Sequence, residues 1–321
     1  MKRFVIKGVI FSIIILVVFL LLNQFFFHFV VAESFEFKEG VNYREFLDES
    51  KTIDFAFFGT SHMQHAINPE YLPNSFNFAD SGKNYLLSYY QLKNLVENEN
   101  VKINVLVLEI DPVSFSDHIY QEPFLFPYPN YYSGFFTLED ATTIQEREYL
   151  DVFLEYLFPF VGRGKEFGQK ALLGFLGKYE SEEVVLGWRK QCKDFDAESV
   201  GTLVDFQVKD EENLLVNERG VNSFIKIIEL AKKNNILLVL LKEPYLKNYA
   251  NRTSSQINQD SKFYADLFLK INKVTTEYSV IDYSDRFQDI NYFFDPYHIN
   301  CTGAKVVSKS LLTDINKIQS N

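Results

Sequence analysis

The sequence is poor in cysteine and in positive charge. Its 321 residues include only two cysteines, Cys192 and Cys301, which excludes a multi-disulfide framework and a cysteine-rich zinc site. Acidic residues outnumber basic ones by 43 to 32, and this argues against a nucleic-acid partner, because binding to a phosphate backbone needs a basic surface. With 47% hydrophobic residues, the chain has enough apolar material for a large core, so intrinsic disorder is excluded for most of it.

One long hydrophobic run stands apart from the rest of the chain. A basic flank at residues 2–7 precedes an almost unbroken apolar run at residues 9–22, and residues 25–32 continue it. A signal peptide has an apolar region of about 7 to 15 residues, whereas about 20 residues span a bilayer. We therefore predict a membrane anchor at residues 1–32, with the basic end in the cytoplasm and the chain from about Glu33 onward outside it. A buried core helix and a cleaved signal sequence are the alternatives, and cleavage would leave the export prediction unchanged.

Beyond a polar stalk, residues 33–51, strand and helix patterns alternate. Short apolar runs predict parallel strands buried on both faces, whereas apolar residues three and four apart predict helices. We expect strands at 53–58, 75–79, 103–110, 236–241 and 279–283, and helices at 83–98, 221–233 and 302–318. Residues 52–321 are thus predicted to form an α/β domain with a doubly wound parallel sheet of about five strands and helices on both faces. Ligands of such sheets bind outside the carboxyl ends of the strands.

An insertion at about residues 112–210 interrupts this alternation. It is rich in aromatic residues, above all in Tyr120–Phe136, and residues 149–160 and 165–179 have helical patterns. We expect a small helical cap near the strand ends. Exposed tyrosines on it would suit sugar rings, but we favour the alternative that these aromatic residues pack the insertion's own core.

Two short motifs at opposite ends of the domain supply the parts of a nucleophilic site. Gly59-Thr60-Ser61-His62 follows the first expected strand, and Asp295-Pro296-Tyr297-His298 precedes the last expected helix. A serine hydroxyl becomes a good nucleophile when a base removes its proton, and the base works better when a carboxylate orients it. We predict that Ser61 is the nucleophile, that His298 is the base and that Asp295 orients it.

In these motifs the chain resembles the SGNH/GDSL hydrolase superfamily, whose first block is Gly-x-Ser and whose last block is Asp-x-x-His. The resemblance implies a sheet of about five parallel strands (SGNH/flavodoxin-like) and an oxyanion hole that includes the backbone N–H of Ser61. Ala79-Asp80-Ser81-Gly82 fits the second block, which implies that the N–H of Gly82 also faces the oxyanion. The third block, Gly-x-Asn-Asp, is replaced by Leu108-Glu109-Ile110-Asp111-Pro112. Asn84 is the substitute candidate for the missing amide donor.

The anchor, the Gly-Thr-Ser-His turn and the missing third block make the chain similar to exported proteins of alginate O-acetylation and teichoic-acid D-alanylation. This similarity implies an acylated surface glycan or cell-wall polymer as substrate, and an integral-membrane acyltransferase as the partner that donates acyl groups. We therefore expect an esterase or O-acyltransferase that forms an acyl-Ser61 intermediate. An inactive scaffold or glycan-binding protein and a lipid esterase are the alternatives.

The remaining candidate residues carry weaker signals. His62 is expected to contact substrate or to be structural. Glu109 and Asp111 offer carboxylates that could bind a cation, but an Asp before a proline more often forms a turn, and we predict no metal and no cofactor. Cys301 either pairs with Cys192 or is buried as a free thiol, and we favour the free thiol.

Overall fold

The computed structural model describes residues 2–26, 35–120, 136–158, 183–196, 216–247 and 254–320. The chain divides into two compact units, of which the smaller contains residues 1–40 and 127–182 and the larger residues 41–126 and 183–321. The expected helix at residues 165–179 lies outside the described residues.

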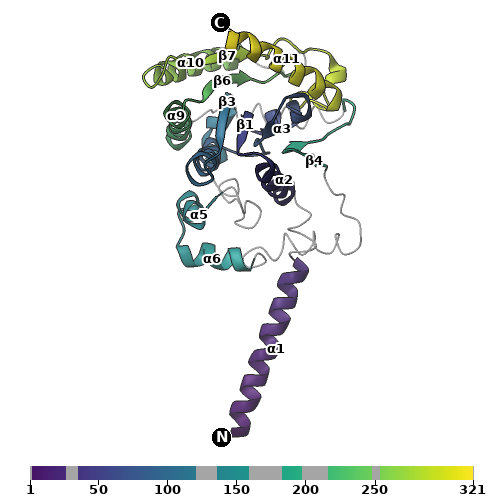
Figure 1. Cartoon of the computed structure of the whole chain (residues 1–321), viewed down its shortest axis with the longest axis vertical. Helices are drawn as coiled ribbons and strands as arrows, with labels where there is room; N and C mark the ends of the chain where they lie inside the picture. Colours follow the sequence, from purple (N-terminus) through teal and green to yellow (C-terminus); the bar gives the residue numbers. More distant parts are fainter. Residues whose placement is uncertain are drawn as a thin grey trace. The chain divides into compact units, whose positions relative to one another are not determined.

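The larger unit is an α/β structure built on a five-stranded parallel sheet (Figure 1). Its strands follow the order β2-β1-β3-β6-β7, which in chain order is the 2-1-3-4-5 pattern of flavodoxin-like sheets. The bounds are β1 Thr52–Phe58, β2 Ser75–Asn77, β3 Lys102–Glu109, β6 Leu237–Lys242 and β7 Ser279–Asp282. The predicted fold class is confirmed, and each expected strand is present within a few residues.

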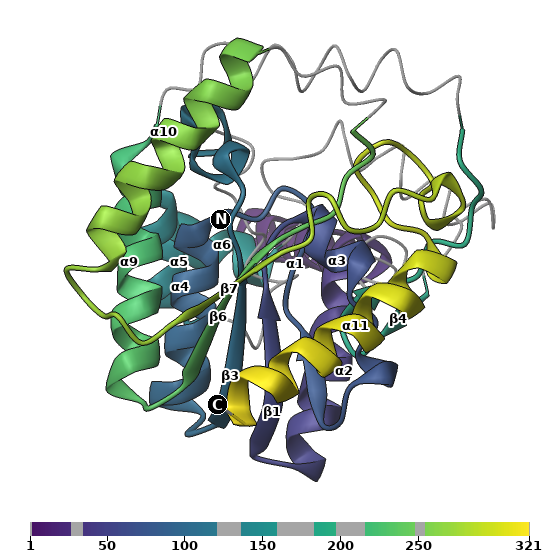
Figure 2. The same cartoon turned by 90° about the horizontal axis from the view of Figure 1, so that it is seen from above.

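Helices cover both faces of this sheet (Figure 2). On one face, α3 (Ser61–Ala66) and α11 (Cys301–Ser320) pack on alternate strand residues such as Phe55 and Phe57. On the other lie α4 (Tyr85–Lys93), α9 (Glu218–Lys233) and α10 (Ser254–Ile271). A single π turn, η3 (Asn94–Asn98), follows α4, and the 3-10 turns are η2 (Pro69–Tyr71), η4 (Pro112–Phe115), η5 (Asp117–Tyr120) and η6 (Ile290–Tyr292). Because both faces are covered, β1, β3 and β6 are nearly all apolar, which is what made them predictable.

The segment expected as a polar stalk contains a helix, α2 (Phe35–Glu49). Tyr43 of α2 is buried, and its ring meets those of Phe76 and Phe78 edge to face at 5.8 and 5.6 Å. Tyr43 and Leu47 are four residues apart, so they share one helix face while the charged residues between them face solvent. No helix was predicted here because the apolar stripe is narrow and the rest of the segment is largely polar.

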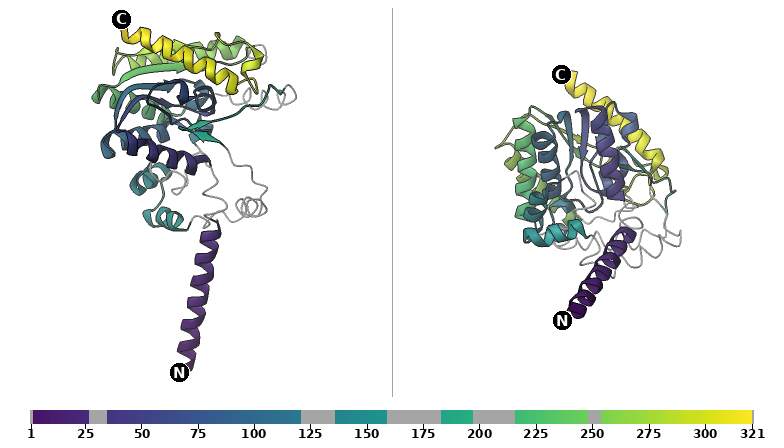
Figure 3. Two further views of the ribbon diagram at one scale, coloured as in Figure 1. Left: turned by 45° about the vertical axis from the view of Figure 1, so that its right-hand side comes forward. Right: turned by 60° about the horizontal axis from the view of Figure 1, so that its bottom comes forward.

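The smaller unit contains α1 (Lys2–Phe26), α5 (Leu138–Gln145) and α6 (Tyr149–Leu157). Figure 3 draws α1 as one unbroken helix. Its residues Phe4–Phe25 are long and apolar enough to cross a membrane, a property that an amino-terminal signal sequence shares. The helix expected at residues 149–160 is present as α6.

A hairpin of β4 (Val184–Val185) and β5 (Trp188–Arg189) packs on the edge strand β2 and on α3. The N–H of Asn77 donates to the carbonyl of Leu186 at 2.9 Å. Gly187 has a φ of +82°, and a Cβ there would lie 1.8 Å from the carbonyl oxygen of Asn77. The hairpin therefore needs glycine at this position, both for its backbone conformation and for its close approach to β2.

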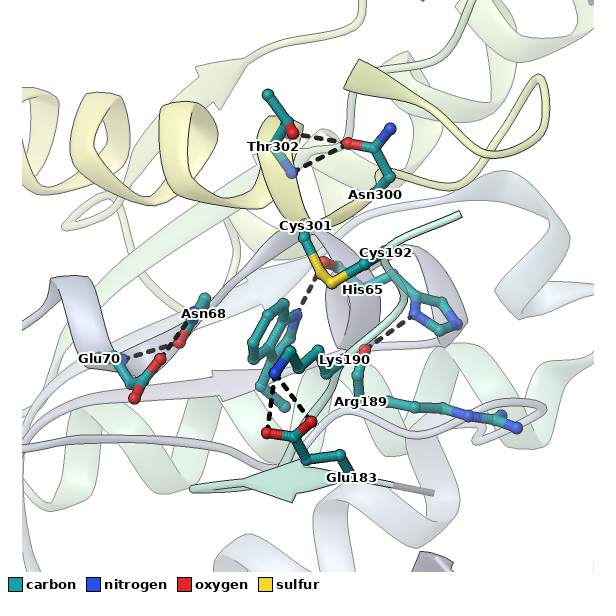
Figure 4. The surroundings of a disulfide bond; sticks show 12 residues. His65, Asn68, Glu70, Glu183, Arg189, Lys190, Cys192, Asn300, Cys301 and Thr302 are labelled. Carbon is teal, nitrogen blue, oxygen red and sulfur yellow. Dashed lines mark hydrogen bonds and ion pairs between the residues drawn. A yellow bond between two sulfur atoms is a disulfide. The ribbon is translucent and has the colours of Figure 1, made fainter. Parts of the chain in front are cut away.

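Cys192, just after the hairpin, forms a disulfide with Cys301, the first residue of α11 (Figure 4). The expectation of a free thiol is thus wrong. The backbone N–H of Cys301 also donates to the carbonyl of Gln191 at 2.8 Å, so the two segments lie side by side although 109 residues separate the cysteines. Such a non-local pairing leaves no trace in local sequence patterns.

Removing this disulfide is expected to destabilise the larger unit. Closing a loop of about 100 residues is worth up to about 4.7 kcal/mol by the chain-entropy model, and native disulfides contribute about 2 to 5 kcal/mol. Urea unfolding of the variants Cys192→Ser, Cys301→Ser and the double variant measures this loss. All three should lose the same amount, since each lacks the same bond, and an unchanged unfolding midpoint in the double variant would contradict the prediction.

Candidate active site

Ser61 lies where the sequence placed it, in the turn after β1. Thr60 is the N-cap of α3 and has extended backbone angles, and its hydroxyl accepts a hydrogen bond from the N–H of His62. This cap makes Ser61 the first residue of α3, at the carboxyl edge of the sheet. In the 2-1-3-4-5 order the chain reverses direction across the sheet between β1 and β3, and ligands bind at such a switch point.

Glu109, the last residue of β3, holds the turn that carries Ser61. Its carboxylate accepts hydrogen bonds from the backbone N–H of Thr60 at 2.5 Å and from the Thr60 hydroxyl at 3.0 Å. A Cβ on Gly59 would lie 2.1 Å from Oε2 of Glu109. Gly59 is therefore required because the Glu109 side chain packs directly on the backbone of the turn.

His298 reaches Ser61 from the segment before α11. Its Nε2 lies 2.8 Å from Oγ of Ser61, although the two residues are 237 positions apart. Its Nδ1 lies 2.8 and 3.0 Å from the two oxygens of Asp295. Since a carboxylate accepts hydrogen bonds, these partners assign the proton to Nδ1 and leave Nε2 as acceptor for the Ser61 hydroxyl.

The loop from Asp295 to His298 is itself fixed by hydrogen bonds. Oδ1 of Asp295 accepts from the backbone N–H groups of Tyr297 and His298, both at 2.9 Å. A bridge between Phe293 and Ile299 closes the base of the loop. The spacing of three residues thus lets one carboxylate orient the ring and order the backbone beneath it.

The pKa values of Asp295 and His298 are both lowered, which keeps the carboxylate charged and the imidazole neutral. Burial alone would raise the pKa of Asp295, but its hydrogen bonds, chiefly with His298, outweigh burial and lower the pKa below its ordinary value. Burial lowers the pKa of His298, Asp295 opposes this effect, and the charge of His62 adds to the lowering. A neutral His298 at neutral pH is the form that can accept a proton from Ser61.

A second histidine, His62, lies beside the first. The two rings are 4.9 Å apart between centroids, and Nδ1 of His62 is 3.4 Å from Oε1 of Glu109. Burial opposes a charge on His62, but contact with Glu109 and the nearby charges of Asp111 and Glu243 outweigh it and raise the pKa to about 9. His62 is therefore a cation next to His298 at neutral pH.

Three carboxylates gather around this cation. Donor atoms of His62, Glu109 and Asp111 lie within 4.8 Å of one another, a spacing that could hold a metal ion. Both oxygens of Glu243 are shielded from solvent and have no hydrogen-bond partner among the described residues. Burial and the charge of Glu109 raise the pKa of Glu243 well above its ordinary value. Within this cluster the closest contact of His62 is its ion pair with Glu109, at 3.4 Å.

His65, one helical turn after Ser61, differs from His62 in charge. Its Nδ1 lies 3.1 Å from the carbonyl of Arg189 in the β4–β5 hairpin (Figure 4), and its ring is 5.5 Å from that of His298. Burial, assisted by the charges of His298 and Arg189, lowers the pKa of His65 to about 3. One neutral and one cationic histidine therefore flank His298.

The turn that carries Gly82 is hydrogen-bonded to the turn that carries Ser61. The N–H of Asp80 donates to the carbonyl of Gly59 at 3.3 Å, and Gln64 of α3 bridges Asp80 and Ser81. Gly82 has a φ of 72°, a conformation that glycine adopts without strain. Its role in an oxyanion hole stays a prediction.

The side chain of Asn84 makes structural hydrogen bonds. Its side-chain oxygen caps α4 by accepting from the N–H of Leu87 at 3.1 Å, and its amide donates to the carbonyl of Ile119 at 3.0 Å. These contacts give no support to Asn84 as the missing amide donor.

The meeting of Ser61, His298 and Asp295 was thus expected from the sequence, but the hydrogen bonds that Glu109 accepts from Thr60 were not. The available signal was the carboxylate of Glu109 at the end of β3, the strand that pairs with β1 before Ser61. The chain matches no family model, and no curated protein matches it.

Proposed function

We propose that the protein is a membrane-anchored, extracytoplasmic serine esterase or O-acyltransferase of SGNH type that acts on a surface polysaccharide or cell-wall polymer. The observation that carries this proposal is the chain of contacts from Ser61 through His298 to Asp295. In support of the SGNH assignment, both motifs lie at the carboxyl edge of a 2-1-3-4-5 parallel sheet. The apolar helix α1 and the disulfide support an exported location.

Acyl transfer would proceed through two half-reactions. Oγ of Ser61 attacks the ester carbonyl carbon while Nε2 of His298 takes its proton, and the backbone N–H groups of Ser61 and Gly82 are the candidate donors to the resulting oxyanion. The bond to the leaving alcohol then breaks as His298 returns the proton to that oxygen. Water or a sugar hydroxyl next gives its proton to His298 and attacks the carbonyl carbon of the acyl-serine. The bond between that carbon and Oγ then breaks as His298 returns the proton to Oγ, which regenerates both Ser61 and the neutral His298.

Whether the acyl group passes to water or to a sugar depends on the acceptor, because the same three residues serve both reactions. The membrane anchor favours transfer, since it would hold Ser61 near an integral-membrane acyltransferase that supplies acyl groups. A lipid esterase would instead prefer long acyl chains to acetyl.

Trapping the acyl-enzyme tests the proposal. The full chain in detergent, treated with an aryl acetate and quenched in acid, should carry one acetyl group on the peptide that contains Ser61, as read by mass spectrometry. The Ser61→Ala variant should carry none. A wild-type chain that stays unmodified by the acetate and by a fluorophosphonate probe would favour the inactive scaffold.

The pH dependence of esterase activity should respond to His62. Because the pKa of His298 lies below its ordinary value, the acid limb of kcat/KM against pH is expected to have its midpoint below 6.5. The substitution His62→Gln removes a neighbouring positive charge, so the pKa of His298 should rise and the midpoint should move to higher pH.

The matched control for this measurement is His65→Gln. His65 is also in ring contact with His298 but is neutral over the working range, because its pKa is about 3. Its replacement should leave the midpoint in place. An equal shift in both variants would show that packing, rather than the charge of His62, sets the pKa of His298.

A further inference from the structure

Helix α6 in the smaller unit exposes a broad apolar face. Leu150 is 63% exposed and Tyr149 is 56% exposed. At 100° per residue the apolar side chains occupy a continuous arc of about 160°. They are Tyr149, Leu150, Phe153, Leu154, Tyr156 and Leu157. Such a face is a liability in water, because it is wide, contiguous and unbroken by charge.

The other sides of α6 carry one buried apolar residue and two acidic residues. Val152 is fully buried. Glu155 is held in a two-pronged ion pair with Arg147, at 2.9 and 2.7 Å. Asp151 and Glu155 thus form a narrow acidic side next to the apolar arc, so α6 is amphipathic with its apolar side outward.

The carboxyl end of α6 contacts the last two turns of α1. The side-chain amide of Asn23 donates to the carbonyl of Leu157 at 3.2 Å, and the rings of Phe19 and Phe158 meet edge to face at 4.7 Å. A helix of about 20 residues matches the hydrocarbon thickness of a bilayer. Within a membrane-spanning α1, Asn23 therefore lies near the boundary between hydrocarbon and headgroups, and the end of α6 lies at the same level.

We propose that α6 is an interfacial helix, which lies along the membrane surface and buries its apolar arc between the headgroups and acyl chains of the leaflet that α1 leaves. A lipid surface is the occupant that fits, because the arc continues from an apolar span and carries two tyrosines, residues that favour the interface. The polar side is acidic, so apolar burial and not charge provides the attraction. This proposal rests on α1 as a membrane anchor and is independent of the chemistry at Ser61.

Spin labels on single engineered cysteines test the proposal. The two native cysteines are joined to each other, so a third one can be labelled specifically in the full chain. In phosphatidylcholine nanodiscs, a label on Leu150→Cys or Leu154→Cys should collide several-fold more often with oxygen, which concentrates in lipid, than with a water-soluble nickel chelate. A label on Asp151→Cys, the matched control on the acidic side, should show the reverse preference.

Three results would overturn the interfacial position. Labels at 150 and 154 that are as accessible to the nickel chelate as the label at 151 would place the whole helix in water. Labels protected from both reagents would mean that a protein surface, such as a second copy of the chain, covers the arc. Raising the salt concentration should leave the expected pattern unchanged, and loss of the pattern in high salt would also contradict it.

Discussion

Replacing Ser61 with alanine is expected to lower esterase turnover by about 10⁵- to 10⁶-fold, the scale on which loss of the serine disables Ser-His-Asp enzymes. Without Oγ the acyl-enzyme cannot form, and only positioning and oxyanion stabilisation of a direct attack by water remain. The fold should persist, because the hydroxyl of Thr60, and not that of Ser61, caps α3. The measurement is aryl-acetate hydrolysis, with urea unfolding as the test of folding.

The control for this substitution is Ser284→Ala. Ser284 also follows a strand of the same sheet, but its hydroxyl is bonded to Asp282, and it has no place in the proposed chemistry. It should keep full turnover. If Ser61→Ala kept more than about a tenth of wild-type turnover while folding normally, an acyl-serine mechanism would be wrong.

The second large effect is expected from Asp295→Asn, which should lower turnover by about 10⁴-fold, as the same change does in other Ser-His-Asp sites. Asparagine is nearly isosteric, and its oxygen can still accept from the N–H groups of Tyr297 and His298. Its amide nitrogen, however, would then face Nδ1 of His298 and require the opposite tautomer, with the proton on Nε2. His298 could no longer accept the proton of Ser61.

A control variant distinguishes the loss of His298 orientation from the loss of one negative charge. Asp282→Asn, at the end of β7 and bonded to Ser284, removes one negative charge from the same unit without touching His298, and it should leave turnover near that of the wild type. A comparable loss in both variants would attribute the effect to net charge or stability. Tautomer assignment by ¹⁵N chemical shifts of His298 checks the physical cause directly.

The sequence predicted the sheet because strands covered on both faces are almost entirely apolar, as in β1, β3 and β6. The contact between Ser61 and His298 was predictable for a related reason. Ser61 follows β1 and His298 precedes α11, and both positions lie at the carboxyl edge of the sheet. Four helices were not predicted. The helices α3 and α5 are only six and eight residues long, α2 has a narrow apolar stripe, and α10 begins in a polar segment.

The arrangement around Glu109 could not be derived in the same way. A glutamate at the end of an apolar strand fits a cation site, an ion pair or a solvated strand end equally well. Only the register of β1 on β3, which places Phe58 beside Leu108, brings the Glu109 carboxylate to Thr60 and His62. The disulfide was missed for the same reason, because pairing between distant segments is a property of the fold.

If the chain is exported, as proposed, the bond between Cys192 and Cys301 sets an order of events. Cys301 follows His298 by three residues and is among the last parts of the described chain to be synthesised, whereas the segment around Ser61 is among the first to emerge after α1. The bond forms only once both cysteines have reached an oxidising compartment. In that case a chain still in transit would hold Ser61 without His298, and the two residues would come together only after His298 had crossed.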